Sequence, residues 1–305
     1  MANAMEDGDG LVPEEIKVPS QVFDVAFHPQ RNVIAVAQID GPITIHSFST
    51  QEQNKMLMEL THHKKACRAV SFTEDGKYLL SVSKDKSLQA VDMNTGSVAL
   101  TRKKAHESPI NCVKVISEYL VATGDDNGGV KVWYCVKFGD GSLSVFNVRR
   151  LKLEDKSDNM ETELLSVTLV KGGRKVICGT GEGALNIFTW GEWGDISDRF
   201  PGHPQSVDAC VAISDNVVCT GSMDGIIRAI HILPNRLIGP VGEHSDFPIE
   251  RIRLSPDENL LASCSHDQTV KFWDIEHLRD TTISPGSKKS ETVKSGTSSN
   301  FFADL

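Results

Sequence analysis

The chain has 305 residues, of which 39% are hydrophobic, and a formal net charge of −9 at pH 7. This size suits one domain with a buried core, while the acidic balance argues against a wide basic surface for nucleic acid. No 18-residue window is apolar enough to span a membrane. The seven cysteines contain no C-x-x-C pair, which favours reduced, buried thiols in strands over a zinc site.

Three regions are predicted in chain order. Residues 1–12 are acidic and Gly-rich and are predicted to be disordered. In residues 13–280, short runs of alternating apolar and polar residues are separated by turns rich in Pro, Asp, Asn and Gly, which is typical of β-strands. The first such set reads VFDVAFHP, VIAVAQ and ITIHSF. Residues 14–20 (EEIKVPS) precede it, and we expect them to add an outer strand to the last set and so close a ring.

The strand sets repeat with a constant period. An acidic turn residue six positions before an aromatic or apolar strand residue marks most repeats, although Trp133 has its aspartate seven positions before. The marked strand residues are His46, Val91, Trp133, Phe146, Phe188, Ile230 and Trp273. Their intervals are 45, 42, 13, 42, 42 and 43 residues, and about 42 residues is the period of WD-repeat blades. We therefore predict an all-β WD-repeat β-propeller, nominally seven-bladed.

One interval is about 29 residues too short for a blade. It lies between Trp133 and Phe146, where residues 140–147 (DGSLSVFN) read as the closing strands of a blade other than that of Trp133. The absent residues would then hold one outer strand and the first two strands of the next blade. We expect six blades, or seven with one truncated, and an uncovered apolar face at this point.

Polar residues recur at matching blade positions. In WD repeats a histidine, a strand Ser or Thr, a turn Asp and a Trp form a buried hydrogen-bonded set; in the last repeat, 242–274, the strand residue is Ser263 or Ser265. The residues expected to hold the blades together are His62, Asp85, His106, Trp133, Asp140, His203, Asp224, His244, Asp267, Trp273 and Asp274. Catalytic triads use the same residue types, but a catalytic set is normally unique. We predict no enzyme, no cofactor and no metal.

Charged residues next to several strands are candidates for an interaction rim around the central channel. They are Arg68, Lys84, Lys86, Arg228 and His266. Such charges either only solvate a surface or bind a partner, since binding residues gather on loops of rigid scaffolds. Residues 281–305 are rich in Ser, Thr, Lys and Gly and are predicted to be disordered. Within them Phe301, Phe302 and Leu305 are either a frayed end or a short partner-binding motif.

Several longer runs are more specific than a Trp-Asp dipeptide. They are KACRAVSFTEDGKYLLSVSKDKS, VATGDDNGGVKVW, ELLSVTLVKGGRKVICGTGEG, SDRF, IRAIHILPNRLIGPVGEH and the ending NFFADL. With these runs, nearly the whole chain from about residue 20 resembles the WD repeat-containing protein 55 family, and its plant members in particular. The ILPNR run and the FFADL ending carry most of the resemblance.

The resemblance implies a propeller of the nucleus, often the nucleolus, with the cytoplasm as an alternative. It implies a role in ribosomal RNA production and development. We expect protein partners such as pre-ribosomal factors, a monomeric chain, and no binding to membranes or directly to nucleic acid.

In plants the resemblance also implies binding to damaged-DNA-binding protein 1, as a substrate receptor of cullin-4 ubiquitin ligases. A W-D-x-R box carries that role. This chain departs from the box, because Trp133 is followed by Tyr-Cys-Val and the dipeptide Trp273–Asp274 by Ile275 and Glu276. Adaptor binding is therefore the alternative function.

Overall fold

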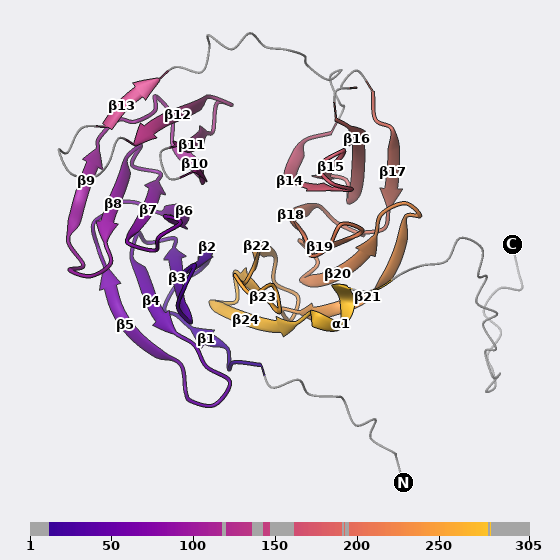
Figure 1. The fold of residues 1–305 in the computed structure, drawn as a ribbon, viewed down its shortest axis with the longest axis horizontal. Coiled ribbons are helices and arrows are strands. Elements are labelled where there is room, and N and C mark those ends of the chain that lie inside the picture. Colours follow the sequence, from indigo (N-terminus) through magenta and orange to yellow (C-terminus); the bar gives the residue numbers. More distant parts are fainter. Residues whose placement is uncertain are drawn as a thin grey trace, which may run out of the picture.

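The strands form six separate four-stranded antiparallel sheets placed around a central channel, with one short helix at the end (Figure 1). The computed structural model describes residues 12–117, 120–135, 143–146, 162–190, 192, 195–279 and 281. The predicted all-β propeller is confirmed, with six blades. Asp140, residues 1–11, nearly all of the predicted tail and its Phe301, Phe302 and Leu305 lie outside the described residues.

Each blade contains four strands that follow one another in the chain, except that the last blade takes its outer strand from the N-terminal end. Blade 1 contains β2 (Val22–Phe27), β3 (Val33–Gln38), β4 (Ile43–Ser47) and β5 (Lys55–Leu60); blade 2 contains β6 (Cys67–Phe72), β7 (Tyr78–Ser83), β8 (Leu88–Asp92) and β9 (Val98–Arg102); blade 3 contains β10 (Ile110–Ser117), β11 (Leu120–Asp125), β12 (Val130–Cys135) and β13 (Leu143–Phe146). Blade 4 contains β14 (Leu164–Val170), β15 (Lys175–Thr180), β16 (Ala184–Thr189) and β17 (Asp198–Pro201); blade 5 contains β18 (Val207–Ala212), β19 (Val217–Ser222), β20 (Ile226–His231) and β21 (Arg236–Glu243); blade 6 contains β22 (Ile249–Leu254), β23 (Leu260–Ser265), β24 (Thr269–Asp274) and β1 (Ile16–Lys17), and α1 (Glu276–Arg279) follows it.

The two ends of the propeller are joined by strand β1. Ile16 pairs with Val270 and Lys17 with Thr269, so the N-terminal strand is the outer strand of the last blade. This confirms the expected role of residues 14–20. The pairing covers the edge of β24 and ties the first and last blades together.

The innermost strand of every blade carries the same irregularity. Its pairing with the second strand shifts by one residue just after the strand begins, as between Val22 and Asp24 in blade 1. The positions that directly follow this shift are therefore equivalent among blades. They are Asp24, Ala69, Cys112, Ser166, Ala209 and Arg251. A bulge at one position in all six blades allows side chains to be compared blade by blade.

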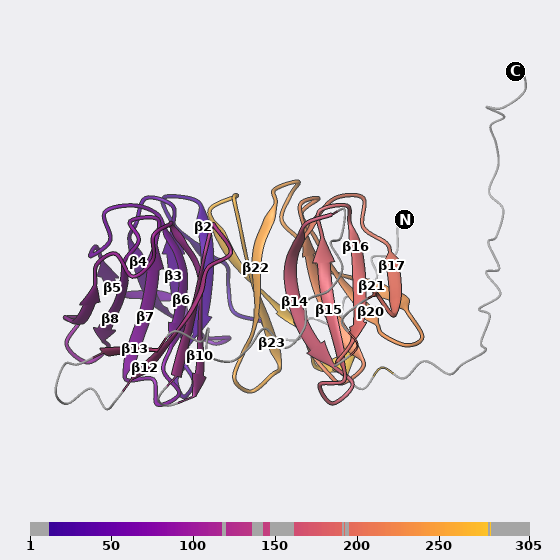
Figure 2. The same ribbon diagram turned by 90° about the horizontal axis from the view of Figure 1, so that it is seen from above.

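The apolar core lies between blades. Separate clusters of buried residues join blade 6 to blade 1, blade 1 to blade 2 and blade 2 to blade 3, and two more join blade 4 to blade 5 and blade 5 to blade 6. Among the described residues no such cluster joins blade 3 to blade 4; a small one on blade 4 alone contains Val176, Cys178 and Phe188. Seen from that side, the far strand β22 is visible between β10 and β14 (Figure 2). As far as the described residues go, the ring is open at the junction of blades 3 and 4.

The sequence interpretation of residues 140–147 is wrong in one respect. Strand β13 pairs with β12, with Phe146 opposite Val132 and Leu143 opposite Cys135, so it completes blade 3 instead of closing another blade. Residues 136–142, which connect the two strands, are as many as residues 48–54 between β4 and β5. The edge of β12 is thereby covered by β13. The ring therefore has six complete blades instead of seven with one truncated, and the expected uncovered apolar face is confirmed.

Most described cysteines are buried free thiols, as predicted. Cys67, Cys178, Cys219 and Cys264 are buried, Cys210 is half-buried, and Cys112 is exposed. Cys112 is the exception because it lies on β10 at the open junction. At closed junctions the equivalent residues Asp24, Ala69 and Ala209 are buried. Within the described ranges there is no helix of the length and apolar character that a bilayer crossing requires.

Candidate functional site at the rim of the central channel

A directed chain of hydrogen bonds runs through the last blade. Trp273 Nε1 donates to Ser263 Oγ over 2.8 Å, and His244 lies between Ser263 Oγ (2.6 Å from Nε2) and Asp267 Oδ2 (2.8 Å from Nδ1). A carboxylate only accepts, so His244 donates through Nδ1 and accepts the Ser263 hydroxyl proton at Nε2. The set predicted from the sequence is confirmed, and Ser263 rather than Ser265 belongs to it.

Blade 3 repeats this arrangement. His106 lies 2.7 Å from both Asp125 Oδ2 and Thr123 Oγ1, and Trp133 Nε1 donates to Thr123 over 2.7 Å. In both blades the histidine and the hydroxyl residue are buried. The two sets therefore fix the turn between the second and third strands to the loop that enters the blade.

Blade 2 uses a different histidine from the one predicted. His63 Nδ1 lies 3.2 Å from Asp85 Oδ2 and its Nε2 lies 2.8 Å from Ser81 Oγ, whereas His62 packs against His63 and reaches only Ser81. Burial, together with the neighbouring His63, lowers the pKa of His62 to about 4. The expected role of His62 in the set thus belongs to the next residue, because only His63 faces Asp85.

Blade 5 keeps half of the set. His203 Nε2 lies 2.9 Å from Thr220 Oγ1, but its Nδ1 faces the Gly183 carbonyl oxygen at 3.2 Å. Asp224 is bound instead by both terminal nitrogens of Arg228, at 3.0 and 2.6 Å. The aspartate thus anchors a cation within its own blade.

The Asp–His–Ser geometry resembles that of a catalytic triad, but these side chains are buried and already paired with one another. His244 and Ser263 are completely buried, and the Ser263 oxygen already accepts the Trp273 N–H. Burial lowers the pKa of His244, and hydrogen bonds from His244 and Thr269 outweigh burial and hold the pKa of Asp267 below its usual value. A substrate has no access to these atoms, so the arrangement stabilises the blade.

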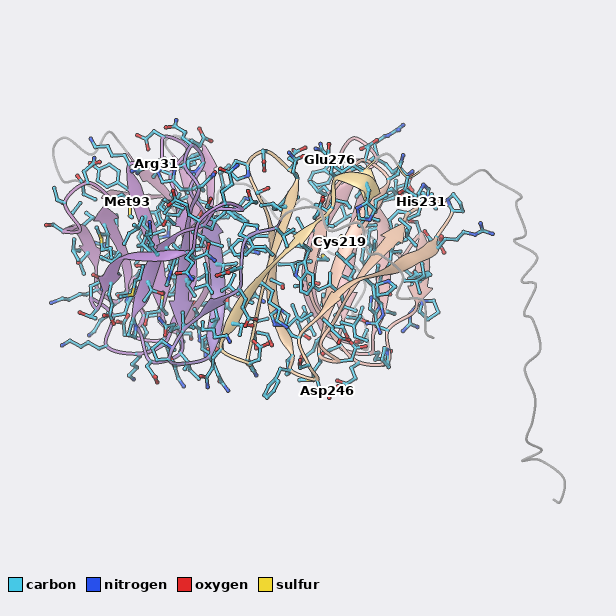
Figure 3. All side chains as sticks on the ribbon, turned by 90° about the horizontal axis from the view of Figure 1, so that it is seen from below. Arg31, Met93, Cys219, His231, Asp246 and Glu276 are labelled. Atoms are coloured by element: carbon cyan, nitrogen blue, oxygen red, sulfur yellow. The ribbon has the colours of Figure 1, made fainter. Side chains whose placement is uncertain are left out.

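The blades present two opposite loop faces. The turns that join strands two and three, and the loops that enter each blade, lie at one end; the other turns lie at the opposite end. Figure 3 shows the two ends, with Asp246 on the first and Arg31, Met93 and Glu276 on the second. Asp274, predicted to be a blade residue, accepts the Glu276 N–H over 3.0 Å and so caps α1 on the second face.

All five predicted rim residues lie at the first loop face, but four of them have partners within the chain. Arg68 pairs with Asp126 (2.6 Å) and His266 with Glu250 (2.6 Å), while Lys86 Nζ donates to the Glu107 carbonyl (2.6 Å) and Arg228 binds Asp224. Lys84 is exposed, and its ammonium group has no hydrogen bond to any described residue. Lys84 is thus the rim cation most available to a partner.

A hollow of about 240 Å³ opens at the first face, at the mouth of the channel. It is lined by Phe23, Arg68, Asn111, Asp126, Glu250 and Arg251. Asn111 also donates to Asp126, over 3.2 Å, so inner strands of blades 2 and 3 share one carboxylate. Asp126 and Glu250 were not predicted as rim residues, although Asp126 directly follows β11 and Glu250 lies at the start of β22, and a charge next to a strand is the signal that singled out the cations.

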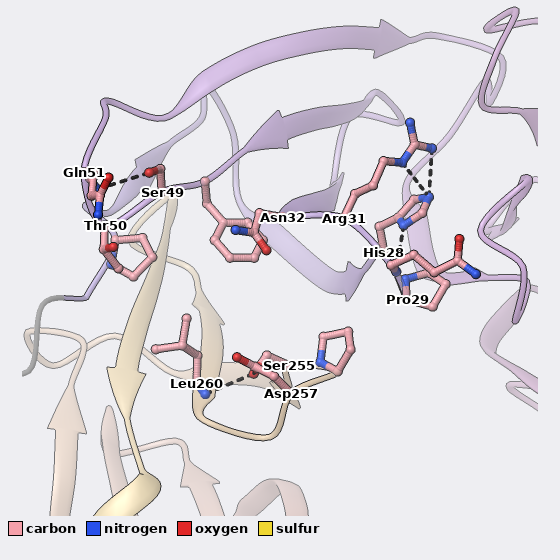
Figure 4. Close-up of a pocket in the computed structure, with 14 residues that line it drawn as sticks. His28, Pro29, Arg31, Asn32, Ser49, Thr50, Gln51, Ser255, Asp257 and Leu260 are labelled. Atoms are coloured by element: carbon pink, nitrogen blue, oxygen red, sulfur yellow. Dashed lines mark hydrogen bonds between the residues drawn. The ribbon is translucent and has the colours of Figure 1, made fainter.

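A larger hollow of about 690 Å³ lies on the second face, where turns of blade 6 and blade 1 meet (Figure 4). Its edge holds buried His28, whose Nδ1 faces the Gln30 N–H at 3.1 Å and whose Nε2 faces Arg31 at 2.8 Å. A neutral imidazole accepts at one nitrogen only, so one of these donors always faces a ring N–H. The sequence did not indicate this hollow, since its turns are about 200 residues apart in the chain.

The described part of the chain has no group of three His, Cys, Asp or Glu residues arranged to hold a metal ion. The carboxylates of the rim and of the blade interiors are already bound by cations, histidines or backbone N–H groups. What the two faces offer chemically is hydrogen bonding and charge on rigid loops.

Comparison with known proteins assigns the chain to a family. It is 38% identical to human WD repeat-containing protein 55 over 331 residues, which cover 96% of this chain and 86% of the human protein. The chain belongs to the WD repeat-containing protein 55 family. The Arabidopsis thaliana member is 37% identical (87% of this chain, 83% of that protein) and the Dictyostelium discoideum homolog 36% (90% and 74%). A family model described as WDR55 matches residues 134–278, and an anaphase-promoting complex subunit 4 WD40 domain model matches residues 25–118.

The alignment agrees with the open junction. Its 331 positions include about 293 residues of this chain (96% of 305), so about 38 positions of human WD repeat-containing protein 55 have no counterpart here. The spacing of the repeats predicts about 29 absent residues. The two values agree with a family member that lacks most of one blade.

Proposed function

We propose that this member of the WD repeat-containing protein 55 family is a non-enzymatic scaffold that binds proteins of the nucleus and nucleolus and acts in ribosomal RNA production. Partners bind at the first loop face, around the mouth of the channel. The observation that carries the proposal is the contrast between the two kinds of polar residue. The Ser–His–Asp sets lie inside the blades, whereas Lys84 and His266 lie in turns at the rim and Arg68 lies at the start of β6 beside them.

The test compares two charge reversals in one blade. Lys84→Glu changes the turn at the first face, and Lys77→Glu makes the same charge change at an exposed lysine of the opposite face. Tagged wild type and both variants replace the cellular copy, and associated nuclear proteins and ribosomal RNA precursors are quantified. We expect Lys84→Glu alone to lose partners and to accumulate precursors. Equal behaviour of the two variants, or no change in precursors when the protein is depleted, would refute the proposal.

Damaged-DNA-binding protein 1 is the alternative partner, as for a cullin-4 substrate receptor. The arginine of the W-D-x-R box is absent after both Trp133 and Trp273. We therefore expect the purified adaptor to be retained weakly or not at all by this chain. Retention equal to that of a chain with the missing segment restored would favour the receptor function instead.

A further inference from the structure

The open junction exposes positions that are buried in closed junctions. On blade 3, Val130 and Val132 occupy the positions that Leu88 and Ala90 hold in blade 2. Leu88 is 2% exposed because blade 3 covers it, whereas Val130 is 66% exposed. The side of blade 3 that faces the opening thus has the apolar character of a blade interface, and no described blade packs against it.

The opposite wall of the opening has the same character. On β14, Val167 and Leu169 occupy the positions of Val70 and Phe72 on β6. Val70 and Phe72 are buried against blade 1, whereas Val167 is 64% and Leu169 47% exposed. Two apolar sheet faces therefore border one opening. Elsewhere in the ring, the equivalent faces pack against a neighbouring blade.

A lysine at the opening corresponds to an arginine that forms an ion pair across a closed junction. Lys114 on β10 is exposed and occupies the position of Arg253 on β22. Arg253 donates over 2.7 Å to Asp24, which lies on the inner strand of the following blade. By equivalence, a blade that follows blade 3 would place the residue at its Asp24 position next to Lys114.

We propose that the open junction binds a β-sheet element of another protein, which inserts between blades 3 and 4 as a seventh blade. The element has apolar residues on both faces, as the two walls require. Its inner strand carries an Asp or Glu opposite Lys114. The site is distinct from the rim of the channel and does not depend on the function proposed for the rim.

Neither the chain itself nor a second copy suits this place. Every described strand already belongs to one of the six four-stranded sheets, so none is free to be donated. The 15 residues 147–161 between β13 and the next described residue are far fewer than the 39 residues from Val22 to Leu60 that make blade 1. A partner that supplies strands in trans resembles the known binding mode in which an extended segment completes a sheet fold.

The test uses a probe whose fit is known. A copy of Val22–Leu60 is fused to a soluble, fluorescently labelled carrier and titrated with the full chain, because blade 1 packs between two blades and carries Asp24. We expect saturable binding that Val167→Asp in the full chain weakens about tenfold or more. Leu57→Asp, at a similarly exposed apolar residue of the outer strand β5, is the matched control and leaves binding unchanged.

A charge exchange tests the predicted contact. Lys114→Asp weakens binding about fivefold or more, and Asp24→Lys in the probe restores it if the two residues meet. The same copy is also inserted after Phe146 of the full chain, where we expect the backbone amides of β10 and β14 to become protected from hydrogen exchange.

The outcomes separate the alternatives. Binding that is insensitive to Val167→Asp, or the absence of both binding in trans and protection in cis, would overturn the proposal. Self-association of the chain without probe that Val167→Asp abolishes would assign the opening to a second copy and would also overturn it.

Discussion

The carboxylate of Asp24 joins three blades, and its removal tests the packing of the ring. Asp24 is completely buried on the inner strand of blade 1. It accepts hydrogen bonds from its neighbour Val25 N–H (3.0 Å), from Val70 N–H of blade 2 (3.1 Å) and from Arg253 of blade 6 (2.7 Å). The substitution Asp24→Ala removes both carboxylate oxygens and with them all three hydrogen bonds.

The expected loss follows from the groups left behind. A buried N–H without a partner costs about 1–3 kcal/mol, and Val25 and Val70 each lose one acceptor. The Arg253 side chain is 40% exposed and can turn to water, so its lost ion pair adds at most about 1 kcal/mol. We expect Asp24→Ala to lower the free energy of unfolding by about 2–7 kcal/mol. The fit of the new side chain is not at issue, because Ala69 and Ala209 occupy the equivalent position in other blades.

Urea unfolding of the full chain, followed by both tryptophan fluorescence and circular dichroism, measures this loss. Asp24→Asn keeps an acceptor oxygen and is expected to cost less than Asp24→Ala, about 1–2 kcal/mol. A cycle with Arg253→Ala isolates the coupling of the ion pair. If Asp24→Ala changed stability by less than about 0.5 kcal/mol, the idea that this carboxylate ties three blades together would be refuted.

Further predictions concern packing and pH. A Cβ atom at Gly242 would lie 2.1 Å from the Trp273 ring, so Gly242→Ala should cost about 1–3 kcal/mol, whereas Gly239→Ala, with open space, should not; equal urea midpoints would contradict this. Val70→Ala should cost about 1.5–3 kcal/mol and Val167→Ala less than about 0.5 kcal/mol in the same assay, and similar costs would argue that the junction is closed in solution. Burial lowers the pKa of several histidines, which take up protons more readily when unfolded, so stability should fall as the pH drops from about 7 towards 4; urea midpoints that rise between pH 7 and 5 would disprove it. These histidines are His28, His46, His62, His203 and His244.

Much of the architecture follows from the sequence alone. Alternation of apolar and polar residues places the strands, and the constant period of about 42 residues identifies the blades. The same period locates the missing unit between Trp133 and Phe146. The polar set of the last blade was also predictable, because the residue types and their spacing leave few ways to pair buried donors with acceptors.

Other features depend on neighbours that are distant in the chain, and only the tertiary structure decides them. His62 and His63 are identical in chemistry, and the difference is which ring faces Asp85 across the blade. Strand β13 pairs with β12 and so completes blade 3. Local patterns determine where a strand forms, since each strand needs only its own alternation. What covers the faces and edges of a strand is determined by residues elsewhere in the chain. At the junction of blades 3 and 4, the blade that would cover these faces is missing.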